Sequence, residues 1–201
     1  MKNVLVINSS ISGDNGHSHK LTRTFVAELG SNINVTEVDL NKAPLPHLEM
    51  TEIAAWMTPE DDRTVEQRQL AKYSDELIQK VKTADVIVLG VPMYNFGVPS
   101  QLKSMLDRLA RAGITFKYTD KGPVGLLDDK PVVVMATRGG LYQGTAADTQ
   151  TPFLQSFFNF IGLTQLHFVY AEGLNMGPES AEKALAAAQQ QLGTLSEKVA
   201  A

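Results

Sequence analysis

Residues 86–103 read VIVLGVPMYNFGVPSQLK, and the fold class can be inferred outward from this stretch. Its first part, Val86–Val91, is apolar, rich in β-branched side chains and too short for a helix. Such a run is typical of a strand that is buried on both faces of a parallel sheet. A turn with prolines and a glycine follows, and a helical spacing begins at Leu102.

The same alternation of a short apolar run and a helical period recurs along the chain. Runs at 4–7, 132–135 and 166–171 are predicted as buried strands, and the more polar run at 33–38 as a strand near a sheet edge. Helices are predicted around Leu21–Leu29, Leu70–Val81, Leu102–Leu109, Phe153–Ile161 and Ala181–Val199. This alternation predicts an α/β protein whose parallel sheet has helices on both faces. The flavodoxin-like and the dinucleotide-binding strand orders both remain open.

Composition is that of one ordinary globular domain, with 201 residues, 43% hydrophobic and 20% charged. We expect a single domain, 1–201, with excursions at about 41–64 and 113–130, where the alternation is interrupted. The net charge of -4 provides no basic field for nucleic acid or an anionic membrane. Cysteine is absent and the N-terminal apolar run is short, so we expect a cytoplasmic protein without disulfides.

The loop after the first strand, Ser9–Ser18, is rich in hydroxyls and glycine and leads into a helix that begins near Ser18. Backbone N–H groups at a helix start, together with hydroxyl donors, favour a phosphate. The alternative interpretation is that Ser18 caps the helix and that the rest is a flexible turn. Neither the dinucleotide motif G-x-G-x-x-G nor the P-loop motif is present, although Asp39 lies where an acid could bind a ribose.

Two other classes of site are also disfavoured. Gly16–Lys20 resembles the G-x-S-x-G elbow of serine hydrolases, but its fifth residue is lysine and it lies several residues beyond the strand. The histidines are scattered, which is more typical of surface or packed residues than of zinc ligands, so no metal is expected. They are His17, His19, His47 and His167.

Two further loops also follow predicted strands. In Pro92–Gly97, proline and glycine fix the backbone, while Met93, Tyr94 and Phe96 offer surface for a planar ring. In Thr137–Gly140, paired glycines bring backbone N–H groups close to a ligand. Ligands of open α/β sheets bind outside the carboxyl ends of the strands, so these loops and Ser9–Ser18 fit flavin mononucleotide (FMN), which has a phosphate tail and a flat redox ring.

At these residues the chain resembles the bacterial FMN-dependent NADH-azoreductases, also described as NADH:quinone oxidoreductases, of the flavodoxin-like superfamily. The resemblance runs nearly end to end. It is carried by Pro92–Phe96, Gln101–Lys103, Arg111–Thr119, Arg138–Gly140, Ala171–Gly173 and Gly177–Glu179. It implies a three-layer α-β-α flavodoxin-like fold with a five-stranded parallel sheet. It also implies a homodimer with one non-covalently bound FMN per subunit and active sites at the dimer interface.

The resemblance also assigns residues to the site. The phosphate and ribityl end would be held by Ser10, Gly16, His17 and Ser18. The isoalloxazine would be lined by Pro92, Met93, Tyr94, Asn95 and Phe96, and its pyrimidine side would meet Thr137, Arg138, Gly139 and Gly140. The substrate would be lined by Phe116, Tyr118, Tyr142 and Phe160. No side chain is expected to act as a nucleophile, and Asn95, Gly139 and Gly140 would support chemistry on FMN.

The implied activity is ping-pong hydride transfer through bound FMN, from NADH or NADPH to quinones and azo dyes. Arg138 would either approach a ribose phosphate or face solvent, so the sequence leaves the choice of nicotinamide open. The alternative function is that of a flavodoxin-like electron carrier without substrate turnover, although such carriers are typically shorter and more acidic. A receiver-like signalling domain is disfavoured. It needs clustered acids after the first strand and an acceptor aspartate after the third, but this chain has Ser9–Ser10 and Pro92–Met93 at those places.

Overall fold

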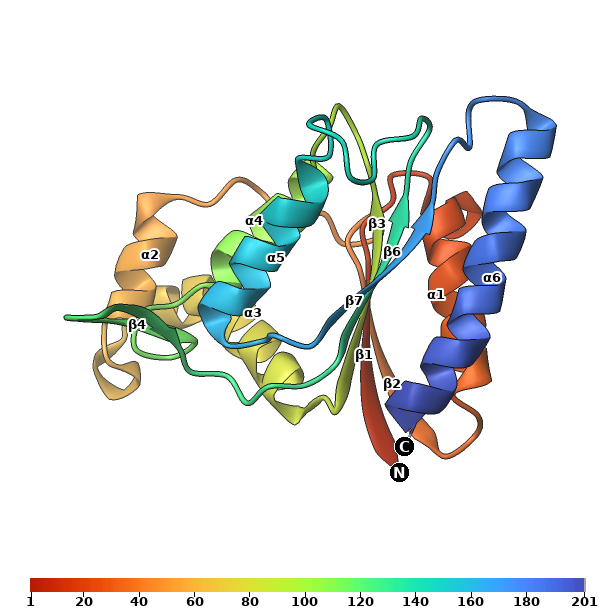
Figure 1. Cartoon of the computed structure of the whole chain (residues 1–201). Coiled ribbons are helices and arrows are strands. Elements are labelled where there is room, and N and C mark those ends of the chain that lie inside the picture. Colours follow the sequence, from red (N-terminus) through yellow and green to blue (C-terminus); the bar gives the residue numbers. More distant parts are fainter. Residues whose placement is uncertain (201) are drawn as a thin grey trace.

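The computed structural model describes residues 1–200 and contains one parallel sheet with the strand order β2-β1-β3-β6-β7 (Figure 1). The strands are β1 (Lys2–Asn8), β2 (Ile33–Asp39), β3 (Val86–Pro92), β6 (Val132–Thr137) and β7 (Leu166–Ala171). Each neighbouring pair in this sheet is parallel. The order is the flavodoxin-like one, and the predicted three-layer fold with a five-stranded parallel sheet is confirmed.

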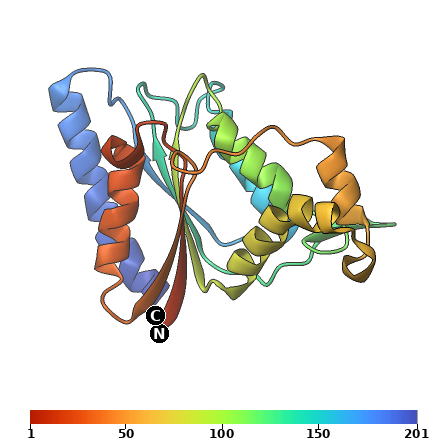
Figure 2. The same cartoon turned by 180° about the vertical axis from the view of Figure 1, so that it is seen from behind.

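Helices cover both faces of the sheet, as predicted. On one face lie α1 (His17–Glu28) and α6 (Pro178–Ala200), and on the other lie α3 (Val65–Thr83), α4 (Ser100–Leu109) and α5 (Gln150–Ile161) (Figures 1 and 2). Alternate residues of β3 point to opposite faces, so Val88 packs with Phe25 under α1 and Leu89 packs with Leu106 under α4. Within residues 1–200, none of the helices combines the length and the hydropathy of a membrane span.

The two edge strands differ from each other and from the centre. Strand β3 is buried at every position, as its sequence predicts. The polar strand β2 is an edge strand, also as predicted. The interpretation of 166–171 as a buried strand is wrong, because β7 forms the other edge and only Val169 and Ala171 are buried. Its remaining apolar side chains pack partly buried against the α5 side of the core.

Both excursions form structure of their own. Residues 41–64 contain α2 (Met50–Met57) and the short 3-10 helix η2 (Glu60–Asp62), and residues 113–130 contain the antiparallel pair β4 (Phe116–Thr119) and β5 (Gly122–Gly125). Asp120–Lys121 form the turn of this hairpin. The Thr119 hydroxyl donates to the Gly122 carbonyl and accepts from the Lys121 N–H, which closes the turn.

A buried ion pair fixes α2 to α4. The Arg108 side chain is 2% exposed, and its Nε and Nη2 each donate to a Glu52 carboxylate oxygen at 2.6 Å. Its Nη1 donates to the carbonyls of Pro46 and Ser104. Bidentate geometry and filled donors make such a pair tolerable inside a protein, but removing one partner leaves a buried charge without compensation.

We predict that Glu52→Gln lowers the free energy of unfolding by about 3 kcal/mol, because Arg108 then keeps its charge in a buried place without a counter-charge. Urea denaturation of the purified protein measures the loss. The control is Glu60→Gln, which removes an exposed carboxylate of the same excursion and should be nearly neutral. Equal stability of the two variants would contradict the assigned role of this pair.

Candidate functional site

The parallel register brings three predicted loops to one edge of the sheet. Asn8 pairs with Gly90, and Pro92 pairs with Thr137, so β1, β3 and β6 end side by side. The chain then continues into residues 9–18, 93–99 and 138–143, which we call the rim loops (Figure 1). Backbone hydrogen bonds tie them together: the Ser9 N–H donates to the Gly90 carbonyl, and the Met93 N–H donates to the Thr137 carbonyl at 2.9 Å.

The first rim loop is folded tightly against the start of α1. The Tyr94 hydroxyl accepts from the Ile11 N–H at 3.3 Å and lies 3.4 Å from the Ser10 hydroxyl, which links the first loop to the second. Gly16 is the N-cap residue of α1, and a Cβ atom there would lie 2.3 Å from the Ser10 hydroxyl oxygen. Only glycine therefore allows this approach.

Ser18 lies in the first turn of α1 and not at its cap. The helix begins at His17, which is exposed, and the interpretation of Ser18 as a cap is wrong. The Ser18 hydroxyl is buried and has no hydrogen-bond partner within residues 1–200. A buried hydroxyl normally has a partner, and the first N–H groups of a helix also lack intrahelical ones. The helix dipole adds positive potential, so this position fits a phosphate group.

The second rim loop presents an aromatic ring to solvent. Tyr94 and Gly97 exchange backbone hydrogen bonds of 3.1 and 3.0 Å, with Asn95 and Phe96 between them at φ values of 48° and 67°. Phe96 is 51% exposed, so it is not part of the core. The amide nitrogen of Gln150 donates to the carbonyls of Pro92 and Gly97 and fixes both ends of this turn.

The third rim loop leaves the N–H groups of its two glycines available. The carbonyls of Gly139 and Gly140 accept from the backbone N–H groups of Asn175 and Gly173 at 3.0 and 2.9 Å. Their own N–H groups have no partner in the part of the chain that the structure describes. Tyr142 follows, half-buried, with its ring edge-on to Phe96 at a centroid distance of 5.6 Å. This loop can therefore donate to the polar edge of a planar ligand.

Arg138 points into the protein. Its side chain is fully buried: Nη1 donates to Glu172 at 2.9 Å, and Nη2 donates to Asp148 at 2.8 Å. The guanidinium also lies over the Tyr170 ring at 4.9 Å. Both predicted orientations, toward a ribose phosphate and toward solvent, are therefore wrong, because two carboxylates hold the charge inside. Only the backbone of Arg138 can face a ligand at the rim.

Asp148 and Glu172 position the third rim loop, and the sequence interpretation gave them no role. One oxygen of Glu172 accepts from Arg138 and from the N–H groups of Tyr142 and Gln143 at 3.0 and 2.9 Å. Burial alone would raise the pKa of Asp148, but hydrogen bonds from Arg138 and Thr151 outweigh it and lower this pKa. The sequence does contain one indication of this role, because Glu172 is an acidic residue directly after a predicted strand.

The remaining predicted pocket residues lie away from the rim loops of the same chain. Phe116 contacts Phe160 and Tyr118 at centroid distances of 4.3 and 5.5 Å. Gln150 at the rim begins α5, whereas Phe160 lies ten residues later, about 15 Å along the helix. The hairpin β4–β5 packs near this far end, and Tyr118 is 74% exposed (Figures 1 and 2).

Comparisons with known proteins agree with this geometry. A family model described as "Flavodoxin-like fold" matches residues 2–195. A relative from Alteromonas mediterranea, named FMN-dependent NADH:quinone oxidoreductase, is 52% identical over 194 residues, covering 96% of this chain and 97% of the relative.

Two solved structures are similar as well. An azoreductase from Bacillus anthracis str. Sterne has a TM-score of 0.88 and 31% identity, covering 98% of this chain and 100% of that one. An FMN-dependent NADH-azoreductase from Bacillus anthracis str. Ames Ancestor, in complex with FMN, has a TM-score of 0.88 and 26% identity, with full coverage of both chains (100% each). The chain therefore belongs to the flavodoxin-like fold family and, within it, to the FMN-dependent NADH:quinone oxidoreductases.

Proposed function

We propose that this protein is an FMN-dependent oxidoreductase that transfers electrons from NADH or NADPH to quinones and azo compounds. The observation that carries the proposal is the buried Ser18 hydroxyl, which has no partner within residues 1–200 and lies at the N-terminus of α1. The exposed ring of Phe96 and the available N–H groups of Gly139 and Gly140 lie on the same rim. Together they match the phosphate, the ring and the polar edge of FMN.

The first rim loop would hold the phosphate and ribityl end through Ser10, Gly16, His17 and Ser18. Tyr94 supports this assignment, because its hydroxyl already braces Ser10 and Ile11. Met93–Phe96 after Pro92 would line the ring. Its pyrimidine side would meet the backbone of Thr137–Gly140, with Arg138 contributing no side-chain contact, because its guanidinium is buried.

Bound FMN would supply the hydride-accepting and hydride-donating chemistry. The chain would orient the ring between the second and third rim loops and donate the Gly139 and Gly140 N–H groups toward its pyrimidine edge. Donors fixed in advance stabilise negative charge without reorganising, which is the main electrostatic contribution available to a protein site. Asn95, beside Phe96 on the exposed turn, would contact the reacting side of the ring. No nucleophilic side chain is required.

The aromatic cluster of Phe116, Tyr118 and Phe160 leads us to propose a homodimer. These rings lie at the far end of α5 and cannot line the same chain's rim. In a two-fold dimer, the exposed hairpin would approach the rim loops of the partner, so that Tyr142 and the partner's hairpin wall a shared substrate pocket. A monomer that retains full quinone turnover would contradict this arrangement.

We propose further that the protein acts in the cytoplasm on small aromatic molecules. The net charge of -4 and the absence of cysteine support that location and give no reason to expect nucleic acid or a membrane as a partner.

The function is tested with purified protein reconstituted with FMN. We expect a yellow protein that releases one flavin per chain on denaturation and that consumes NADH or NADPH when a quinone is supplied. An electron carrier would retain FMN but consume little nicotinamide. Protein that stays colourless after reconstitution would contradict the proposal.

Ser18→Asp should weaken FMN binding by at least about 100-fold, because a second negative charge would face the phosphate. Fluorescence titration of FMN-free protein measures the dissociation constant. Ser31→Asp adds the same charge at an exposed turn before β2 and should leave FMN affinity unchanged. Unchanged affinity in Ser18→Asp would remove this residue from the phosphate site.

Asp148→Asn should lower the free energy of unfolding by about 2 kcal/mol at neutral pH, because the carboxylate accepts a charge-assisted hydrogen bond from Arg138 and hydrogen bonds from Thr151. The pKa of Asp148 is lower in the folded state, so its stabilisation is complete above its unfolded pKa of about 3.9 and disappears as pH falls through the folded value. Urea denaturation between neutral and acidic pH measures this difference, and Asp128→Asn, at an exposed position, is the control. If the two proteins still differed by the full amount in free energy of unfolding at acidic pH, the stabilisation would not come from the ionised carboxylate of Asp148.

A further inference from the structure

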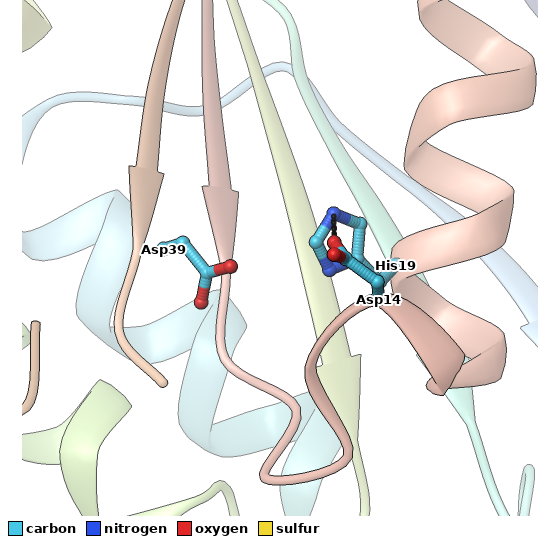
Figure 3. A group of neighbouring side chains, drawn as sticks. All are labelled: Asp14, His19 and Asp39. Carbon is cyan, nitrogen blue, oxygen red and sulfur yellow. Dashed lines mark ion pairs between the residues drawn. The ribbon is translucent and has the colours of Figure 1, made fainter. Parts of the chain in front are cut away.

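Side chains from three separate segments converge beside the first rim loop. Asp14 lies in the short 3-10 helix η1 (Gly13–Asn15), His19 lies in the first turns of α1, and Asp39 ends β2 (Figure 3). One ligand atom from each of these residues lies within 4.8 Å of the other two. Glu37 of β2 is also close, with its Oε1 3.4 Å from the His19 Nε2 atom. The fold, and not the spacing in the sequence, brings these groups together.

His19 is the unusual member of this cluster. Its side chain is 1% exposed, yet neither ring nitrogen forms a hydrogen bond within residues 1–200. Instead, Nε2 lies 3.5 Å from the Asp14 Oδ1 atom, at ion-pair distance but without a hydrogen bond. The Oδ2 atom of Asp39 is also buried without a hydrogen bond. A buried imidazole that points at carboxylates without bonding to them has the arrangement of a ligand around a cation.

The spacing around the His19 Nε2 atom suits a metal ion, while Asp39 lies within 4.8 Å of the other ligand atoms. Zinc binds imidazole nitrogen and carboxylate oxygen at about 2.0–2.2 Å, so two ligand atoms of a tetrahedral site are separated by about 3.3–3.5 Å. The distances from His19 Nε2 to Asp14 and to Glu37 are 3.5 and 3.4 Å. An imidazole among carboxylates favours zinc and its neighbours in the transition series over magnesium, which prefers oxygen ligands alone.

We propose that Asp14, His19 and Asp39 form a binding site for a divalent transition metal of the zinc class, with Glu37 completing the ligand set. This proposal replaces the expectation from the sequence that the histidines bind no metal. The ion would connect η1 and α1 to the end of β2 and so fix the base of the first rim loop. The proposal stands on this cluster alone and does not depend on FMN.

Lys42 already places a cation between the same carboxylates. Its Nζ atom lies 3.6 Å from Asp14 Oδ1 and 3.3 Å from Asp39 Oδ2, and its side chain is 61% exposed. Arg23 approaches Asp14 as well, at 2.5 Å. A long, exposed lysine can swing into water at little cost, so a metal ion would displace its ammonium group. Lys42 is therefore a competitor for the site, and removing it should tighten metal binding.

The test is calorimetric titration of zinc chloride into the FMN-loaded protein, with magnesium chloride as the comparison. We expect one zinc ion per chain and no comparable binding of magnesium. Asp14→Asn should weaken zinc binding by about tenfold or more, because it removes a charged ligand. Asp14 is half-exposed, so we expect the variant to fold normally. Asp61→Asn removes an exposed carboxylate elsewhere and should have no effect. Lys42→Met should bind zinc more tightly than the unaltered protein.

Opposite shifts in the Asp14 and Lys42 variants separate a metal site from general destabilisation, which would weaken binding in both. Cobalt provides a second readout, because its visible absorption reports a nitrogen-containing, low-coordinate site. His19→Gln should abolish this absorption, while His47→Gln, at an exposed histidine, should keep it. Equal zinc affinity of the Asp14→Asn and unaltered proteins, or loss of cobalt absorption in His47→Gln, would overturn the proposal.

Discussion

The first turn of α1 packs directly on β3 at Gly90, and the geometry of the rim depends on this close approach. A Cβ atom on Gly90 would lie 2.8 Å from the Asn8 side-chain oxygen and 3.3 Å from the Ser18 carbonyl. Without that atom, β1, β3 and the start of α1 can meet, and the Gly90 carbonyl accepts hydrogen bonds from both the N–H and the hydroxyl of Ser9. The N-terminus of α1, where we propose that the phosphate binds, is thereby fixed relative to the sheet. Its distance to the other rim loops is set by the backbone and not by a flexible side chain.

On the other side of the rim, a buried network of ion pairs fixes the third rim loop relative to the sheet. Arg138 is held by Asp148 and Glu172, and Glu172 uses the same oxygen to hold the N–H groups of Tyr142 and Gln143. Each nitrogen of the Arg138 guanidinium donates to an acceptor, which is the condition under which buried ions are tolerated. The glycine-containing third rim loop is therefore anchored by side chains that are buried beneath it.

The sequence predicts most of the fold because buried apolar residues recur along the chain in the pattern of the strand or helix that they form. The apolar run of β3 and the helical spacing of α6 each identify their element without reference to the rest of the chain. The direction of a side chain leaves no such periodic pattern. Arg138 lies next to a glycine pair at the rim, and its two carboxylate partners, 10 and 34 residues away, hold it inward. The same limit applies to β7, whose apolar residues cannot reveal that no strand lies beyond it, and to His19, whose neighbours come from separate segments.

The turn that carries Phe96 has a further consequence for recognition. Two consecutive non-glycine residues at positive φ are individually unfavourable, and the turn persists because Gln150 and Thr149 hold its carbonyls from α5 and the residue before it. Its conformational entropy has therefore been lost during folding. A planar molecule that docks on this ring meets a surface that is already ordered, so more of the interaction free energy remains available as affinity.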